Sequence, residues 1–225
     1  MHRWVWDLHY PAPDSIRHDY PIAAIPHDTP RFPLGPTALP GTYSVRLTVD
    51  GKASVSPLTI RMDPRVKTSA VGLQKKFQAE TRLASIMTET AQVLRQGGSI
   101  RAQLEKLSSS STKESIEAFQ KKLTDLLGAP GGFLAPPSQE VTLSRVNGQA
   151  DTLYAQVWQA DAEPTAAQMA VGVATERDSS DVLKRWNDFK NTDLPALNRV
   201  LRESKVPEVK LEADLHQEES QVDEE

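Results

Sequence analysis

Four histidines near the beginning of this sequence are its residues best suited to binding a metal ion. His2, His9, His18 and His27 lie 7, 9 and 9 residues apart in a proline-rich segment. Imidazole nitrogens are common zinc ligands, but zinc sites hold their ligands within short loops or at i, i+4 positions of a helix. The four histidines have neither spacing. We therefore expect no metal site.

Four aspartates in the same segment could supply acid and base groups. Glycoside hydrolysis uses two carboxyl groups held roughly 5–10 Å apart across a cleft. Asp7, Asp14, Asp19 and Asp28 show no spacing that would pair two of them in this way. Aspartate is also common in turns and loops, where its side chain bonds nearby backbone groups. We interpret these four residues as loop acids.

Serine nucleophiles and nucleotide-binding loops also have recognisable patterns. A catalytic serine needs a histidine base beside it, yet there is no Gly-x-Ser-x-Gly motif, and the one histidine after His27 is His216 in an acidic segment. Neither Gly-x-Gly-x-x-Gly nor a P-loop occurs. The glycine-rich GAPGG at residues 128–132 contains a proline and follows no predicted strand. The sequence therefore predicts no catalytic residue and no cofactor-binding residue.

Charge is distributed unevenly along the chain. The formal net charge is −4, but residues 212–225 hold seven acids and no Lys or Arg, which leaves +3 for the rest. Such a small excess does not indicate nucleic-acid binding. The pairs Lys75-Lys76 and Lys121-Lys122 are typical of the solvated face of an amphipathic helix. No run of about 18 apolar residues occurs, so we expect neither nucleic acid nor membrane insertion.

The tryptophans could stack on sugar rings, because aromatic faces bind sugars in that way. Trp4 and Trp6 alternate with Leu8 along residues 4–8, which places all three on one face of a strand. A strand face of this kind normally packs on a core, so we interpret the pair as structural. Trp158 and Trp186 lie beside apolar helical stripes and are predicted to lie in or beside the helical core.

The elements that would position these residues divide at residue 64. The chain has 225 residues and no cysteine, which excludes disulfides and thiolate metal sites. Ten of its sixteen prolines lie in residues 1–64, so this part is predicted to contain strands and extended loops. Residues 43–49 alternate strictly, which predicts a strand with Tyr43, Val45, Leu47 and Val49 buried. Asp50-Gly51 then predicts a hairpin turn and 58–62 a return strand.

The remainder has the spacing of amphipathic helices, with apolar residues at a/d positions of coiled-coil type. The pattern predicts helices over 68–96 and 112–127, the first ending or kinking at Gly97-Gly98 and the second starting with a Ser111-x-x-Glu114 capping box. A third covers 143–157 and a fourth follows Pro164. Residues 191–195 resemble a cap before a last segment that ends at Pro207, and whether this segment continues the fourth helix is open. Such helices must bury their stripes on one another.

Three segments carry a resemblance to a known family. They are RWVWDLHYP at residues 3–11, LPGTYSVRLTVDG at residues 39–51 and LTIRMDPRV at residues 58–66. With them the chain resembles the C-terminal part of bacterial BNR-repeat, sortilin-like proteins, which are often labelled glycosyl hydrolases. That resemblance implies an Ig-like or fibronectin-like β-sandwich followed by helices, export from the cytoplasm, and an N-terminal β-propeller that these residues do not include. Any hydrolase activity would belong to the propeller, so the resemblance assigns no catalytic residue here.

Together these observations predict an α+β chain of two domains. A small, possibly incomplete Ig-like antiparallel β-sandwich occupies 1–63, an antiparallel helical bundle occupies 66–206, and an acidic disordered tail occupies 207–225. The expected function is non-catalytic: an accessory interaction or spacer module of an exported protein, whose partner is another protein or the missing propeller. Two alternatives stay open, a fragment of a glycoside hydrolase and a self-associating helical adaptor.

Overall fold

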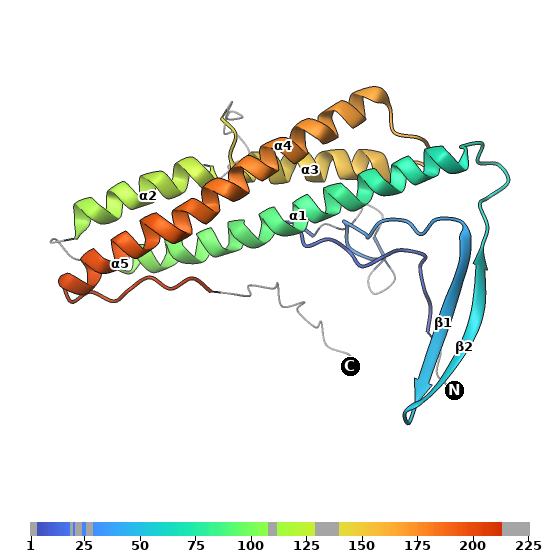
Figure 1. Ribbon diagram of the computed structural model, residues 1–225, viewed down its shortest axis with the longest axis horizontal. Coiled ribbons are helices and arrows are strands. Elements are labelled where there is room, and N and C mark those ends of the chain that lie inside the picture. Colours follow the sequence, from blue (N-terminus) through green and yellow to red (C-terminus); the bar gives the residue numbers. More distant parts are fainter. Residues whose placement is uncertain are drawn as a thin grey trace.

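The computed structural model describes residues 4–18, 20, 24–25, 29–107, 112–128 and 140–212. In this part of the chain, helices form an elongated body, and a two-stranded sheet extends away from one end of it (Figure 1). The strands are β1 (Gly41–Val49) and β2 (Lys52–Ile60). The helices are α1 (Ala70–Glu105), α2 (Lys113–Leu127), α3 (Leu143–Trp158), α4 (Ala166–Asp188) and α5 (Leu194–Glu203), with a π-helical turn (Phe189–Asp193) between the last two.

One hydrophobic core holds the helical body together. α1 runs along the body and packs against α3 and α4, while α2 and α5 lie near its C-terminal end (Figure 1). Apolar residues spaced three and four apart give each helix one apolar side, and these sides meet in the core. Fully or almost fully buried side chains include Met87, Leu123, Tyr154, Trp186 and Leu201. None of the described helices is both long enough and apolar enough to cross a membrane.

α1 does not end at Gly97-Gly98 as the sequence predicts. It continues without interruption to Glu105, giving a helix of 36 residues. The reason is a close approach between helices rather than a helix end: a Cβ atom on Gly97 would lie 2.5 Å from Leu127 Cδ1 of α2, whereas nothing lies within 4 Å of one on Gly98. Gly97 therefore lets α2 pack tightly on α1.

The junction between α4 and α5 answers a question that the sequence leaves open. The two helices are continuous through the π-helical turn, in which the Leu194 N–H bonds the Phe189 carbonyl. Pro195 lies in the first turn of α5, where its missing N–H is tolerated. Asp193 keeps helical backbone angles and makes no capping hydrogen bond. Its carboxylate instead lies 2.6 Å from Lys122 Nζ of α2, so this segment is not the helix cap that its sequence resembles.

Helix capping differs from the prediction at α2 as well. The residue before α2 is Thr112, whose side chain makes no capping hydrogen bond, and Ser111 lies outside the described residues. A capping box occurs instead at α4, where Thr165 and Gln168 each satisfy a backbone donor of the other. The predicted helix at 112–127 is present from Lys113, and the proposed box, which needs Ser111, falls partly outside the described residues.

The predicted Ig-like β-sandwich is wrong, because the described residues contain one sheet of only two strands. Residues 4–8 do not form a strand. The described residues between 4 and 40, which we call the N-terminal strap, run in extended form along the helical body (Figure 1). Their β-type pairing with each other, within the described residues, is one isolated bridge, His9 with Thr37, flanked by two backbone hydrogen bonds. Eight prolines in 11–40 remove the donors that a further strand would need.

The predicted hairpin with its turn at Asp50-Gly51 is confirmed, but its return strand is β2 at Lys52–Ile60 and not residues 58–62. β1 and β2 pair in antiparallel register with Val49 opposite Lys52. Asp50 and Gly51 form the turn with φ values of 47° and 76°, the positive angles of a type I′ turn. The predicted burial of one face is wrong, since Leu47 is 63% exposed and Val49 57% exposed. Within the described residues no second sheet covers Leu47 and Val49.

The chain after α5 returns along the helical body. Val209 is buried and its backbone bonds the side chain of Asn198, while Gln103 of α1 bonds the backbone of Lys210 in both directions. Residues 207–212, which the sequence assigns to the tail, therefore pack against α1 and α5. The rest of the predicted acidic tail lies outside the described residues.

Candidate functional site

Of the four N-terminal histidines considered as metal ligands, the structure describes His9 and His18. His2 and His27 lie outside the described residues. His9 lies beside Asp7, with 3.3 Å between Nδ1 and a carboxylate oxygen, and its ring packs against Trp158. In the ranges that the structure describes, no three His, Asp or Glu side chains come together as metal ligands would.

The aspartates likewise have separate structural partners. Asp7 accepts a hydrogen bond from the backbone N–H of His9 at 3.0 Å. Asp14 forms an ion pair with Arg95 of α1, and its backbone N–H bonds Thr88 Oγ1. Asp19 and Asp28 lie outside the described residues. Asp7 and Asp14 therefore attach the strap to itself and to α1, and they do not form an acid and base pair.

The basic pairs are partly neutralised by neighbouring carboxylates. Lys75 forms an ion pair with Glu163, and Lys122 forms one with Asp193. Lys76 is buried instead of solvated, contrary to the prediction, and pairs with Glu80. This arrangement does not leave a concentrated basic surface of the kind that binds phosphates.

Lys76 and Glu80 form an ion pair inside the fold, and buried charges of this kind often mark functional sites. Lys76 Nζ lies 2.7 Å from Glu80 Oε1, and the two side chains are only 4% and 1% exposed. The backbone N–H of Thr37 bonds the other carboxylate oxygen at 3.3 Å. Burial raises the pKa of the Glu80 carboxyl, and the neighbouring Lys76 opposes that shift. Sequence analysis missed this pair, although Glu80 visibly interrupts the apolar stripe of its helix.

This cluster has no room for a substrate. The cavity beside it, lined by Leu73, Phe77 and strap residues, has a volume of about 20 Å³, which is enough for one water molecule. Tyr154 adds a further anchor nearby, since its hydroxyl bonds the Leu34 carbonyl at 2.7 Å and burial raises its pKa. The cluster therefore fastens the strap to α1 and α3 and offers no exposed acid, base or nucleophile.

A larger groove lies between the strap and α3. It has a volume of about 280 Å³ and is lined mainly by apolar side chains, including Phe32, Leu34 and Trp158. Arg17 and Asp151 contribute charge at its wall. The groove has no neighbouring serine and histidine or pair of carboxylates among its lining residues, so its walls supply no recognisable catalytic group.

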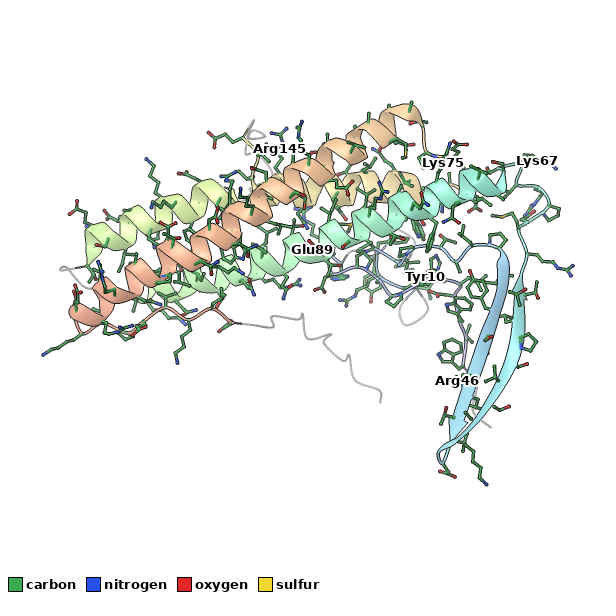
Figure 2. The ribbon with its side chains drawn as sticks, in the orientation of Figure 1. Tyr10, Arg46, Lys67, Lys75, Glu89 and Arg145 are labelled. Atoms are coloured by element: carbon green, nitrogen blue, oxygen red, sulfur yellow. The ribbon has the colours of Figure 1, made fainter. Side chains whose placement is uncertain are left out.

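The most unusual surface is on the hairpin. One face carries Tyr43, Val45, Leu47 and Val49 of β1 and Leu58 of β2, and we call this set the apolar hairpin face. Val45 is 42% exposed and Leu58 36%, and Figure 2 shows these strands extending away from the helices. At its base, Trp6 packs against Tyr43 with ring centres 5.7 Å apart. On this face β2 places Ser54 and Ser56 opposite Leu47 and Val45, so the apolar part is a row along β1 that continues to Leu58. An apolar row open to solvent is typical of interaction surfaces.

The tryptophans differ from their predicted positions in one respect. Trp186 is 2% exposed and lies in the helical core as predicted. Trp158 is partly buried at the edge of that core and donates a hydrogen bond to the Gly35 carbonyl of the strap. Trp4 is 77% exposed, so the prediction that it faces a core is wrong. No strand forms at residues 4–8 to turn Trp4 inward.

Comparison with known proteins adds no identity. No family model matches the sequence, no curated protein matches it, and no solved structure matches it. None of these comparisons supports the resemblance to BNR-repeat, sortilin-like proteins, which stays a prediction.

Proposed function

We propose that this chain is a non-catalytic interaction module, in which the helical body supports a β-hairpin that pairs with β-structure of another polypeptide. The observation that supports this proposal is the apolar hairpin face, whose β1 side chains at Val45, Leu47 and Val49 are 42–63% exposed. A two-stranded sheet with an open apolar face is stable only marginally by itself and gains stability by adding strands.

The helical body suits this role because one core joins its helices. That core is continuous and includes residues of every helix from α1 to α5. The strap fixes the hairpin to this body through Tyr154, Glu80 and Arg95. The strap contacts thus attach the hairpin to the helical body, as a spacer or accessory module requires.

The rival proposal, a fragment of a glycoside hydrolase, has less support. Asp7 and Asp14 are each engaged in local structure, and the buried Glu80 has no substrate-sized cavity beside it. We expect no turnover of a panel of aryl glycosides by the purified chain. Turnover that disappears in Asp14→Asn but persists in Arg95→Met, which loses the same ion pair, would favour the hydrolase instead.

Strand pairing can be tested with a synthetic probe. The probe is a blocked peptide with the sequence of β1, GTYSVRLTV, added at increasing concentration to ¹⁵N-labelled chain. We expect amide shifts concentrated in residues 41–60. A control peptide with proline in place of the Ser and the Arg has fewer backbone donors and should cause no shifts.

A variant of the apolar hairpin face completes the test. Leu47→Ser removes an exposed side chain that a partner would cover, and should weaken peptide binding about tenfold, which corresponds to about 1.4 kcal/mol. Thr59→Ser, on the opposite face of the hairpin, is the matched control and should bind the probe normally. Absence of shifts at millimolar peptide, or shifts confined to the helices, would contradict the proposed function.

A further inference from the structure

The two edges of the hairpin are not equivalent. In a two-residue turn the N–H of Lys52 bonds the carbonyl of Val49, so these residues form a hydrogen-bonded pair. Hydrogen-bonded and non-hydrogen-bonded pairs alternate along an antiparallel ladder. Ser44 and Pro57, which are opposite one another, therefore form a non-hydrogen-bonded pair, and their backbone nitrogens point away from the hairpin.

Pro57 accordingly prevents another strand from pairing with the outer edge of β2. It has no N–H and lies in the middle of that edge, between the outward-facing backbone groups of Val55 and Thr59. Proline on an edge strand prevents the addition of another strand there. β1 has no proline, and its outward-facing residues Thr42, Ser44, Arg46 and Thr48 are all exposed.

The outer edge of β1 is free of backbone partners within the described residues. The nearest chain segment is the strap, and its backbone hydrogen bonds at Leu8 and Tyr10 go to Ala38 and Pro36. None of the backbone hydrogen bonds in the described part of the chain reaches the outward-facing residues of β1. β1 therefore presents unpaired donors and acceptors beside the apolar hairpin face.

Resting on the proposed function, we infer that the strand added at this edge is β1 of a second copy of this chain, in antiparallel register about a two-fold axis at Val45. In this register Thr42 lies opposite Thr48 of the partner subunit, and Ser44 lies opposite Arg46 of the partner subunit. All the outward-facing groups of both strands are then paired, giving about eight hydrogen bonds. The product is a four-stranded sheet.

The side chains in this register are compatible on both faces. On the apolar face, Val45 lies opposite Val45 of the partner subunit and Tyr43 lies opposite Leu47 of the partner subunit, pairs that favour β-structure. On the other face, threonine lies opposite threonine and Arg46 lies opposite a serine, so no like charges are directly opposed. A two-fold axis also gives a closed dimer rather than a fibre, since Pro57 protects the two remaining edges.

Sedimentation velocity on the intact chain from about 1 to 500 µM tests the inference. Two proline variants are compared with the wild type. Ser44→Pro blocks the outer edge of β1, and Val55→Pro changes an outward-facing position on β2. Neither substitution removes a hydrogen bond within the hairpin. We expect a reversible dimer in the wild type and in Val55→Pro, and at least about 30-fold weaker association in Ser44→Pro, with the same thermal unfolding of the helices in all three.

Each other outcome has a distinct meaning. A dimer that resists both substitutions would overturn the inference and favour association through the helices. Equal loss in both variants would also overturn it, because the β1 edge would have no special role. A wild type that is monomeric throughout overturns the dimer. If that monomer still binds the β1 peptide, the proposed function stands with a different partner strand, and if it does not, both proposals fail.

Discussion

A pair of glycine substitutions in α1 gives the sharpest test of the packing described above. Gly97 and Gly98 are neighbours in the middle of a helix, where replacing glycine by alanine normally stabilises by about 0.5–1 kcal/mol. Gly98 is exposed and has open space beside it, so Gly98→Ala should show that gain. Gly97 is buried, and an added Cβ would lie 2.5 Å from one methyl group of Leu127 and 2.7 Å from the other.

The close contact sets the expected size of the difference. Leu127 is 3% exposed, so it has little space into which it can rotate. Overpacking of this kind costs about 1–3 kcal/mol, which exceeds the gain in helix propensity. Gly97→Ala should therefore lower the free energy of unfolding by about 0–2 kcal/mol while Gly98→Ala raises it. For a chain of this size, 1 kcal/mol shifts the melting temperature by about 2–4 °C.

Urea unfolding followed by circular dichroism at 222 nm measures both variants. The Leu127→Ala background provides the control, because it removes the methyl groups that the new Cβ would meet. In that background Gly97→Ala should become neutral or stabilising, a coupling that a double-mutant cycle detects. If both alanine variants stabilise the wild type equally, then the contact between α1 and α2 does not require glycine and the reasoning is refuted.

Three further results are expected. Because burial raises the pKa of Glu80, the wild type should lose unfolding free energy relative to Glu80→Gln as pH rises from about 4.5, and parallel pH profiles for the two proteins would contradict this. Leu123→Ala should cost about 2–5 kcal/mol in urea unfolding, and Phe77→Ala, which removes a less buried side chain, should cost less. Asp14→Asn should destabilise by about 1 kcal/mol through its ion pair with Arg95, an effect absent in an Arg95→Met background.

The sequence predicted the elements whose signals are local. Helical stripes located α2 and α3 to within a residue or two, and strict alternation with Asp50-Gly51 located the hairpin. These signals depend on backbone preferences and on the period of apolar residues, which neighbours in the sequence determine. The burial of Val45, Leu47 and Val49 was a different kind of inference. It assumed a covering sheet, and nothing in the alternation itself supplies one.

The errors inside the helical body have a common origin in contacts between distant residues. The pair Gly97-Gly98 normally predicts the end of a helix. Here Leu127 of α2 lies so close to α1 that only glycine fits at position 97 without a clash. The residues next to Lys76 in the sequence predict that its side chain is solvated. It is instead buried against Glu80, because the strap crosses that side of α1. The candidate interaction surface was missed for the same reason. Exposure of a strand face is a property of the whole fold.

The length of α1 has a mechanical consequence. With 36 residues at about 1.5 Å each, it forms one rod of about 54 Å that begins at Ala70, ten positions after the end of β2, and reaches α2 at its far end. The hairpin joins the start of this rod through residues 61–69, and the strap that precedes the hairpin contacts the rod further along, at Glu80 and Arg95. α1 thus fixes the distance between the elements at its two ends. Any insertion in it would move the hairpin relative to α2 and α5 by a set distance and rotation for each added residue.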